Sequence, residues 1–536
     1  MAIVSLNKSE VKKIVGDMND EKLESTLSMF GTAVERITSE EAEVEVAPNR
    51  PDMLSAQGIY RALKTYFGKK QKEYKVNAPG KDFEVKIDPG LKGIRPYTAC
   101  AIVKNLKFND AQIKEIIDIQ EKLHATIGRN RKKLAIGIYP LEKIKLPISF
   151  KAELPDKIKF IPLEMPQEMT GRQILSRHPT GREYAYLLEN LSKYPVFRDA
   201  KEDVLSMPPI INSQMTGKVT EETKDIFIEC SGFDLKVLQK TINILVTALA
   251  DMGGEIYGMK LDYEGNKIIS PNLDSEKIKI NIKDAEKLLG IPLNEELVKK
   301  LLERMGYSYS KGVAEIPAYR ADILHPADIY EDIAIAYGYD KFTPEIPEIA
   351  TIGQESESEM KKKKIAEILS GLGLLEISTY HLSTKEDIKN LGIKKAIEVL
   401  ESKTDYNMLR PNLLINSLKT LGENTDAKYP QKIFESGKVF EANGEDIEEK
   451  EKLCIAVSGE TDFTEIKQIF DYLARMLGKE YKIEEAEDSA FIEGRCGKIM
   501  INDKAIGILG EISPNILKAF NLKMPSVALE VNLEEL

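Results

Sequence analysis

The stretch AYRADILHPADIYEDIAIAYGYD, residues 318–340, predicts a helix whose two ends are both marked in the sequence. Pro326 predicts the first helical turn, because proline is pre-set for that position and disfavours helix in the residue before it. Gly338 predicts the C-terminal end of the same helix. Ile329 and Ile333 recur at helical spacing and form a face suited to a core.

The same stretch concentrates four carboxylates, at Asp322, Asp328, Glu331 and Asp332. The last three share one helical face, and Asp322 lies in the preceding turn. One interpretation is that the helix macrodipole favours acids in the first turn by about 0.3–1 kcal/mol each. The other is a site for a hard cation, since Mg²⁺ and Ca²⁺ prefer oxygen ligands. Both stay open, because the choice depends on burial.

Composition restricts the class of protein. A length of 536 residues suggests three or four domains, and 42% hydrophobic residues are ample for several cores. The N-terminus does not resemble a secretion signal, and no apolar run is long enough to span a bilayer, so we expect a cytoplasmic protein with no membrane partner. The four cysteines and four histidines are scattered, which argues against a sequence-local zinc site and suits a reducing compartment.

The formal net charge of −11 argues against general coating of nucleic acid. Two local basic runs stand out, GRNRKKLA at residues 128–135 and the lysines of residues 361–364. We interpret both as solvated ends of helices or strands.

The order of predicted elements indicates an α+β multidomain chain. We expect an N-terminal α+β domain at 1–90, in which Asp52 caps a helix, and an editing-type α/β domain at 91–270. A compact winged-helix-like domain at 271–345 carries the four acids. An α+β domain rich in antiparallel strands occupies 346–536.

Glu229 ends the apolar strand IFIE within the segment SMPPIINSQMTGKVTEETKDIFIECSGFD, residues 206–234. From the residues alone it is either a charge at an exposed rim or a carboxylate that faces a pocket. The segment before it, from Asn212 to Thr223, is a run of hydroxyl and amide side chains.

Several common catalytic motifs are missing from the sequence. There is no GxxxxGK[ST] phosphate loop, no dinucleotide fingerprint and no GxSxG elbow. The segment KIFESGKVF, residues 432–440, resembles the antiparallel core of class II aminoacyl-tRNA synthetases. The arginine that grips the α-phosphate of ATP in that class is replaced by Ile433, and the closing segment at residues 507–520 also lacks the class II arginine. We therefore expect an inactive class II synthetase-like domain.

The sequence from end to end resembles the beta subunit of phenylalanine-tRNA ligase, of the shorter archaeal and eukaryotic type. The resemblance rests on seven stretches, residues 47–63, 94–106, 121–139, 206–234, 316–339, 409–437 and 491–499. It implies an α₂β₂ tetramer whose alpha subunit attaches phenylalanine to tRNA(Phe) with ATP. This chain then supports that reaction, lacks the aminoacylation site, and hydrolyses mischarged Tyr-tRNA(Phe).

The resemblance also implies site residues. Asp322, Asp328, Glu331 and Asp332 match an acidic run that binds Mg²⁺ in a site shared with the alpha subunit. In the editing domain, Glu229 matches a carboxylate that recognises the hydroxyl of tyrosine.

Two further residues, Asn212 and Ser231, are candidate pocket or water-positioning groups. This sequence has Ile211-Asn212 where bacterial relatives have glycines. No Cys–His or Ser–His pairing occurs in the region, so a positioned water is expected to perform the hydrolysis.

Two alternatives from other classes remain at this level. The acidic run also suits a self-contained magnesium-dependent phosphotransferase or nuclease, for which Arg320 and His325 are the nearest additional groups. The chain could also be a non-enzymatic RNA-binding scaffold, although its acidic balance and its lack of an aromatic-rich basic stripe weigh against that.

Overall fold

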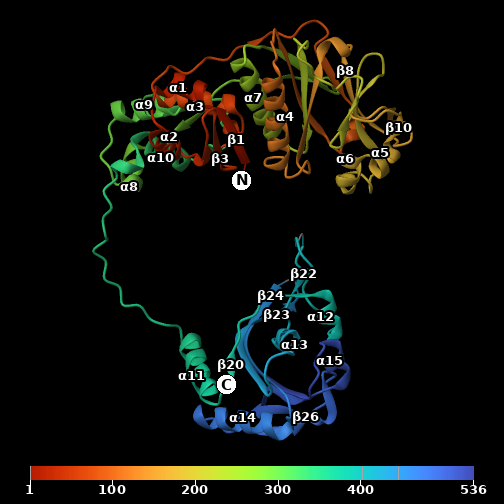
Figure 1. Ribbon diagram of the computed structural model, residues 1–536, viewed down its shortest axis with the longest axis vertical. Helices are drawn as coiled ribbons and strands as arrows, with labels where there is room; N and C mark the ends of the chain where they lie inside the picture. The colour runs from red at the N-terminus through yellow and green to blue at the C-terminus, as the bar shows by residue number, and fades with distance from the viewer. Residues whose placement is uncertain (1, 401, 445) are drawn as a thin grey trace. The chain divides into compact units, whose positions relative to one another are not determined.

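The computed structural model describes residues 2–400, 402–444 and 446–536 (Figure 1). They form two compact units, Met1–Glu345 and Ile346–Leu536, which are described separately. Both units combine helices with sheets, which confirms the predicted α+β class. The predicted segments 1–90 and 346–536 include positions 1, 401 and 445, which lie outside the described residues.

The first unit begins with a three-stranded antiparallel sheet in the order β1-β3-β2. Its strands and accompanying helices are β1 (Ala2–Asn7), β2 (Ala33–Ile37), β3 (Glu41–Val46), α1 (Lys8–Val15), α2 (Asp20–Met29) and α3 (Ala56–Tyr66). In β3 the buried Ala42, Val44 and Val46 alternate with glutamates, so one face of the strand meets the core and the other meets water.

The cap of α3 differs from the prediction. Ser55, not Asp52, caps the helix, and its hydroxyl accepts the N–H of Gly58 at 3.1 Å. Asp52 is buried in the short 3₁₀ turn Pro51–Met53, where the Arg50 guanidinium donates to both of its oxygens at 2.9 Å. The expected capping role of Asp52 is wrong because an adjacent arginine binds the carboxylate.

An 11-stranded sheet forms the middle of the first unit, with the path β13-β12-β11-β8-β5-β15-β6-β14-β7 and with β4 and β16 paired to β15. Its strands are β4 (Val76–Asn77), β5 (Glu84–Ile87), β6 (Tyr97–Lys104), β7 (Leu134–Pro140), β8 (Ile148–Glu153), β11 (Tyr194–Arg198), β12 (Val204–Met207), β13 (Ile211–Asn212), β14 (Ile226–Gly232), β15 (Glu255–Tyr263) and β16 (Asn266–Ser270). Around it are α4 (Asp110–Ala125), α5 (Gly171–Arg177), α6 (Pro179–Glu183), α7 (Leu235–Asp251) and the small pair β9 (Lys159–Phe160) and β10 (Met169–Thr170).

Strand β14 is buried along its whole length because it lies between β6 and β7, and because α7 packs on β6 and β14. Helix α7 presents Leu238, Ile242, Leu245 and Leu249 at helical spacing, all buried. A carboxylate on such a strand, such as Glu229, cannot be a rim charge, since every residue of β14 is covered.

The acidic stretch lies in the third part of the first unit. Three helices pack with a three-stranded antiparallel sheet in the order β17-β19-β18. The elements are β17 (Glu276–Lys279), α8 (Ile282–Leu289), α9 (Glu295–Arg304), β18 (Ser308–Ser310), β19 (Val313–Ile316) and α10 (Pro326–Tyr337). Helix α10 begins at Pro326 and is followed by Gly338, as the sequence predicted.

One continuous hydrophobic core joins these parts of the first unit. Buried side chains from β1 and α3, including Ile59 and Leu63, belong to the same cluster as Ile242 of α7 and Leu302 of α9. Helices α3 and α9 lie close together in Figure 1, in agreement with their direct packing contacts.

The second unit is built on a seven-stranded sheet in the order β20-β23-β24-β28-β27-β26-β25. Its strands are β20 (Leu375–Glu376), β23 (Gln431–Asn443), β24 (Asp446–Ser458), β25 (Lys482–Glu485), β26 (Phe491–Ile501), β27 (Lys504–Ile512) and β28 (Ser526–Asn532), and β21 (Leu382–Thr384) pairs with β22 (Tyr406–Leu409). The helices are α11 (Glu357–Gly371), α12 (Lys385–Asn390), α13 (Leu414–Glu423), α14 (Phe463–Met476) and α15 (Pro514–Ala519).

Both faces of this sheet are covered. Phe434 and Ile455 belong to the core cluster that includes α11 and α14, whereas Ile433 and Cys454 belong to the cluster around α13. The alternation follows from the two-residue period of a strand. Among the described residues, no helix is both long enough and apolar enough to cross a membrane.

Candidate functional site

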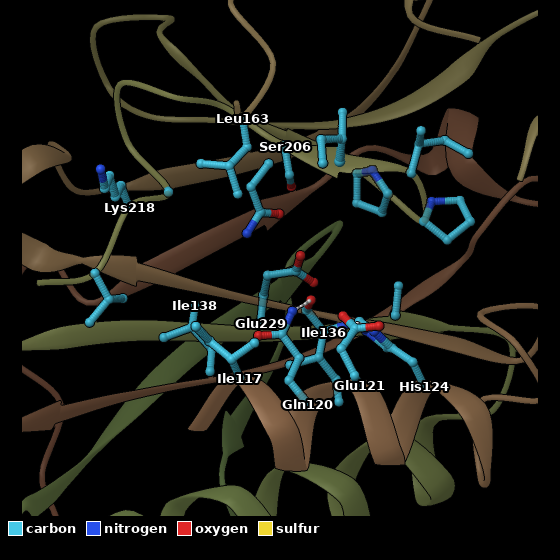
Figure 2. A pocket seen from close by; sticks show the side chains of 18 of the residues that line it. Ile117, Gln120, Glu121, His124, Ile136, Ile138, Leu163, Ser206, Lys218 and Glu229 are labelled. Carbon is cyan, nitrogen blue, oxygen red and sulfur yellow. Dashed lines mark hydrogen bonds and ion pairs between the residues drawn. The ribbon is translucent and has the colours of Figure 1, made fainter. Parts of the chain in front are cut away.

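A cavity of about 510 Å³ lies beside β7, the last strand of the large sheet. Its walls come from α4, β7, the segment 206–219 and β14 (Figure 2). Apolar side chains such as Ile117, Ile136 and Ile138 form much of the lining, and Glu229 reaches into it from β14. The cavity therefore offers an apolar wall with a carboxyl group inside.

Glu229 is 1% exposed, and Tyr139 Oη donates to its Oε1 at 3.2 Å. Its other oxygen, Oε2, is buried and has no hydrogen-bond partner among the described residues. Burial raises the pKa of Glu229 to about 8, and the positive charge of Arg95 opposes this shift. At neutral pH the protonated form predominates, so Glu229 offers both a donor and an acceptor to a group in the cavity.

The backbone opposite Glu229 is shaped to leave it space. Gly137 is its cross-strand partner on β7. A Cβ on Gly137 would lie 2.7 Å from Glu229 Oε1 and 2.1 Å from Tyr139 Oη. Any larger residue at this position would have to displace Tyr139 or Glu229, because both polar side chains use the space that a methyl group would fill.

The structure brings Asn212 to the predicted pocket but not Ser231. Asn212 lines the cavity, and its Oδ1 accepts from Tyr139 Oη at 3.4 Å. Ser231 is fully buried outside the cavity lining, where its Oγ accepts Arg95 Nε at 3.0 Å. Ser231 holds the arginine whose charge acts on Glu229, and its own hydroxyl also opposes the rise in the pKa of Glu229; its role in the pocket stays a prediction.

Sequence reasoning missed Tyr139, which connects Glu229 with Asn212, and the polar group at the α4 end of the cavity. There His124 Nε2 accepts the N–H of Ile136 at 2.8 Å, and its Nδ1 faces Glu121 at 3.2 Å. Burial lowers the pKa of His124, so its neutral form is favoured. A tyrosine at the end of an otherwise apolar strand was the available signal for Tyr139.

The four carboxylates of the acidic stretch do not converge. Arg320, which is 2% exposed, donates to Asp322 at 2.9 and 2.7 Å and to Asp332 at 2.8 Å. Asp328 accepts the N–H groups of Leu324 and His325, both at 2.8 Å.

Glu331 is exposed and has no ion pair or hydrogen bond to the described part of the chain. Across the described positions, no group of three or more His, Cys, Asp or Glu is arranged to hold a metal ion. Among the described residues, this chain alone does not offer the four carboxylates as free Mg²⁺ ligands, because a buried guanidinium binds Asp322 and Asp332 and the helix start binds Asp328. The predicted site shared with an alpha subunit stays a prediction.

In the class II-like segment of the second unit, the key side chains are also buried or bound to other groups of the protein. Ile433 is buried in the core, and Glu435 Oε1 accepts Arg410 Nη1 at 2.7 Å with both side chains buried. Thr379 Oγ1 completes this cluster by donating to Glu435 Oε2 at 2.7 Å. Glu435 is thus bound to protein groups, and Ile433 supplies no cation for a phosphate.

Comparison with known proteins assigns these parts to known families. The B3/4 domain matches residues 96–246, the tRNA synthetase B5 domain matches 278–339, and the phenylalanyl tRNA synthetase beta chain CLM domain matches 343–533. The cavity around Glu229 is lined mostly by the first match, and the acidic stretch lies almost wholly in the second.

Relatives that are similar over nearly the whole chain include phenylalanine–tRNA ligase beta subunits of archaea. The phenylalanine–tRNA ligase beta subunit of Pyrococcus abyssi is 40% identical over 91% of this chain and 90% of its own length. That of Archaeoglobus fulgidus is 36% identical over 99% and 98%. A solved N-terminal fragment of the phenylalanyl-tRNA synthetase beta subunit from Pyrococcus horikoshii matches with a TM-score of 0.59 and 36% identity, over 62% of this chain and 99% of the fragment. The chain belongs to the family of phenylalanine–tRNA ligase beta subunits, which are components of an aminoacyl-tRNA synthetase.

Proposed function

We propose that this chain assembles with an alpha subunit into an α₂β₂ phenylalanine-tRNA ligase, and that its own cavity hydrolyses mischarged Tyr-tRNA(Phe). The alpha subunit attaches phenylalanine to tRNA(Phe) with ATP. The inactive state of the second unit supports this division of labour, because Ile433 stands in place of a cation and Glu435 pairs with Arg410. The cytoplasmic location stays a prediction.

The observation that carries the editing proposal is the buried Glu229 with its unpartnered Oε2. An apolar synthetic pocket rejects an isostere with one extra hydroxyl by only about 100-fold, so a second site is useful. In the cavity, the tyrosine hydroxyl would pair with Glu229. Phenylalanine would leave that buried group unpaired, which costs about 1–3 kcal/mol.

Hydrolysis by a positioned water suits the polar groups of this cavity. Both ring nitrogens of His124 are engaged, by Ile136 and by Glu121, so this histidine is not free to activate a serine. Water adds to the ester carbonyl and releases tyrosine and the ribose hydroxyl of the tRNA. Asn212, with Tyr139, is the candidate to orient that water.

The acidic stretch does not support a self-contained magnesium-dependent phosphotransferase or nuclease. Arg320 already forms ion pairs with both Asp322 and Asp332. The Mg²⁺ requirement is proposed for the assembled enzyme, and no step of the hydrolysis is assigned to a metal.

The test is deacylation of Tyr-tRNA(Phe) and Phe-tRNA(Phe) by the assembled enzyme. Glu229→Ala should slow Tyr-tRNA hydrolysis by about 10–100-fold, the worth of a buried hydrogen bond to the substrate, while ligation of phenylalanine persists. Glu164→Ala is the matched control, because Glu164 is an exposed carboxylate on the wall of the same cavity. If the two variants hydrolysed Tyr-tRNA(Phe) at equal rates, Glu229 would have no role in substrate recognition.

A further inference from the structure

A second cavity, of about 1130 Å³, lies in the first unit away from Glu229. It is bounded by the end of α3 with the following segment 67–75, by the second half of α9, and by β18 with the nearby residues 317–319. We call it the α3–α9 cleft. It exceeds the roughly 300–1,000 Å³ typical of small-molecule pockets, so it suits a larger or extended ligand.

The cleft is strongly basic although the chain as a whole carries a net charge of −11. Its lining has seven cationic and two acidic side chains: Lys69, Lys70, Lys72, Lys75, Lys299, Lys300 and Arg304, against Glu73 and Glu303. Clustered cations with this excess create a local positive potential that attracts phosphates.

Four of these lysines have no partner. The ammonium groups of Lys69, Lys70, Lys75 and Lys300 are exposed and form no ion pair or hydrogen bond with the described part of the chain. In the basic runs found in the sequence, by comparison, Lys362 and Lys363 pair with glutamates, and Arg131 pairs with Glu121. The cleft is therefore a basic surface whose charges are not already used.

The walls beneath these lysines are held by specific contacts. Arg304 Nε donates to the carbonyl of Tyr66 at 3.0 Å, and its guanidinium lies 4.3 Å from the centre of the Tyr66 ring. Lys72 Nζ donates to the carbonyl of Ala250 at 2.7 Å, and Gln71 Nε2 donates to Tyr319 Oη at 3.2 Å. The backbone that carries the unpaired lysines is thus held in place, while their ammonium groups stay available to an anionic ligand.

An aromatic ring lines the same cleft. Phe67 is 40% exposed and packs edge-on against Tyr66 at 5.6 Å. Basic grooves that present an exposed aromatic ring are typical of surfaces for single-stranded nucleic acid, since bases stack on the ring while lysines bind the backbone. An acidic peptide would use the lysines and has no such need for the ring.

We propose that the α3–α9 cleft binds an RNA strand, with Lys69, Lys70, Lys75 and Lys300 on its phosphates and Phe67 against a base. Naming tRNA(Phe) as that RNA rests on the proposed function. The RNA contact itself is independent of whether the Glu229 cavity edits.

The test is fluorescence anisotropy of labelled tRNA(Phe) and of an unrelated single-stranded RNA, titrated with the full chain over a range of salt. The variant Lys69→Gln, Lys70→Gln, Lys75→Gln, Lys300→Gln should lose about 10-fold or more in affinity at low salt. The slope of log affinity against log salt should fall by about 3, since each of the four phosphate contacts contributes about 0.7–0.9.

The matched control is Lys394→Gln, Lys395→Gln, Lys518→Gln, Lys523→Gln, which removes the same charge from exposed, unpaired lysines of the second unit. It should leave the slope unchanged. Equal slopes and affinities for both quadruple variants would overturn the proposal, and melting temperatures verify that both are folded.

Phe67→Ala separates RNA from an acidic protein segment. It should weaken RNA binding without changing the salt slope, because it removes stacking and no charge. Displacement of the RNA by poly-aspartate at equal charge, together with no effect of Phe67→Ala, would assign the cleft to an acidic protein and overturn the RNA assignment. Loss of Tyr-tRNA hydrolysis in Glu229→Ala tests the editing function separately, so the two proposals can fail independently.

Discussion

Gly137 faces Glu229 across neighbouring antiparallel strands, and it leaves the space that Tyr139 Oη and the Glu229 carboxyl group share. Gly137→Ala should therefore disturb the pocket by pushing against Tyr139 Oη and Glu229 Oε1, without removing either polar group. We expect about 1–3 kcal/mol of destabilisation from overpacking and a larger loss of Tyr-tRNA deacylation than of ligation. The close packing at this position would be contradicted if Gly137→Ala changed the rates of deacylation and ligation by the same factor in the assembled enzyme and left stability unchanged.

The raised pKa of Glu229 predicts how stability depends on pH. Between pH 4.5 and about 8 the folded chain keeps a proton on Glu229 that the unfolded chain releases. The folded state thus binds more protons, and this residue makes stability fall as pH rises, by up to roughly 1.4 kcal/mol per pH unit. Glu229→Gln should be more stable relative to the parent chain at pH 8 than at pH 5 in thermal unfolding. An equal difference in stability at both pH values would mean that the pKa of Glu229 is not raised in the folded chain.

The acidic stretch predicts a ranking of variants in denaturant unfolding of the chain. Asp332→Ala leaves Arg320 buried with one carboxylate fewer and should cost about 3–5 kcal/mol. Asp328→Ala removes the N3 side chain of the capping box at the start of α10, where His325 is the N-cap, and should cost about 0.5–2 kcal/mol. Glu331→Ala should change stability little, because Glu331 is exposed without a partner among the described residues.

Added Mg²⁺ tests the alternative that the four carboxylates form a metal site. With Asp322 and Asp332 bound by Arg320, added Mg²⁺ should leave the unfolding curve of the isolated chain unchanged. Stabilisation by Mg²⁺ that Glu331→Ala abolishes would restore the four-carboxylate site.

From the structure of the second unit, we expect that this chain alone does not activate phenylalanine. Phenylalanine-dependent ATP–pyrophosphate exchange should be silent for the isolated chain and should appear when an alpha subunit is added. Ile433→Arg should not rescue the isolated chain, because Glu435 remains bound to Arg410. Exchange by the chain alone would show that other cations replace the missing arginines.

Local signals in the sequence were enough to predict some elements. Pro326 and Gly338 marked the ends of α10, since proline and glycine act through their own backbone preferences. The apolar stretch LLEISTYHL, residues 374–382, does not form one strand, because Leu375–Glu376 pairs with β23 and Leu382–Thr384 pairs with β22. Pairing depends on a partner strand that local sequence does not reveal.

The site required information that no local pattern contains. Whether Glu229 faced solvent or a cavity depended on β7, nearly a hundred residues earlier in the chain. Arg320 was present in the acidic stretch, yet its bond to Asp332 joins a loop to a buried helical face. The end-to-end resemblance to one family supplied the function, and the geometry then separated Asn212, in the cavity, from Ser231, outside it.

The core shared by α3, α7 and α9 has a consequence during synthesis on the ribosome. The apolar face of α3, with Ile59 and Leu63, leaves the exit tunnel long before residues 295–304 are made. Until then it lacks its partner α9, so this part of the nascent N-terminal region is exposed to aggregation or chaperone binding. A truncated chain that stops at residue 270 would keep that face uncovered on the α9 side.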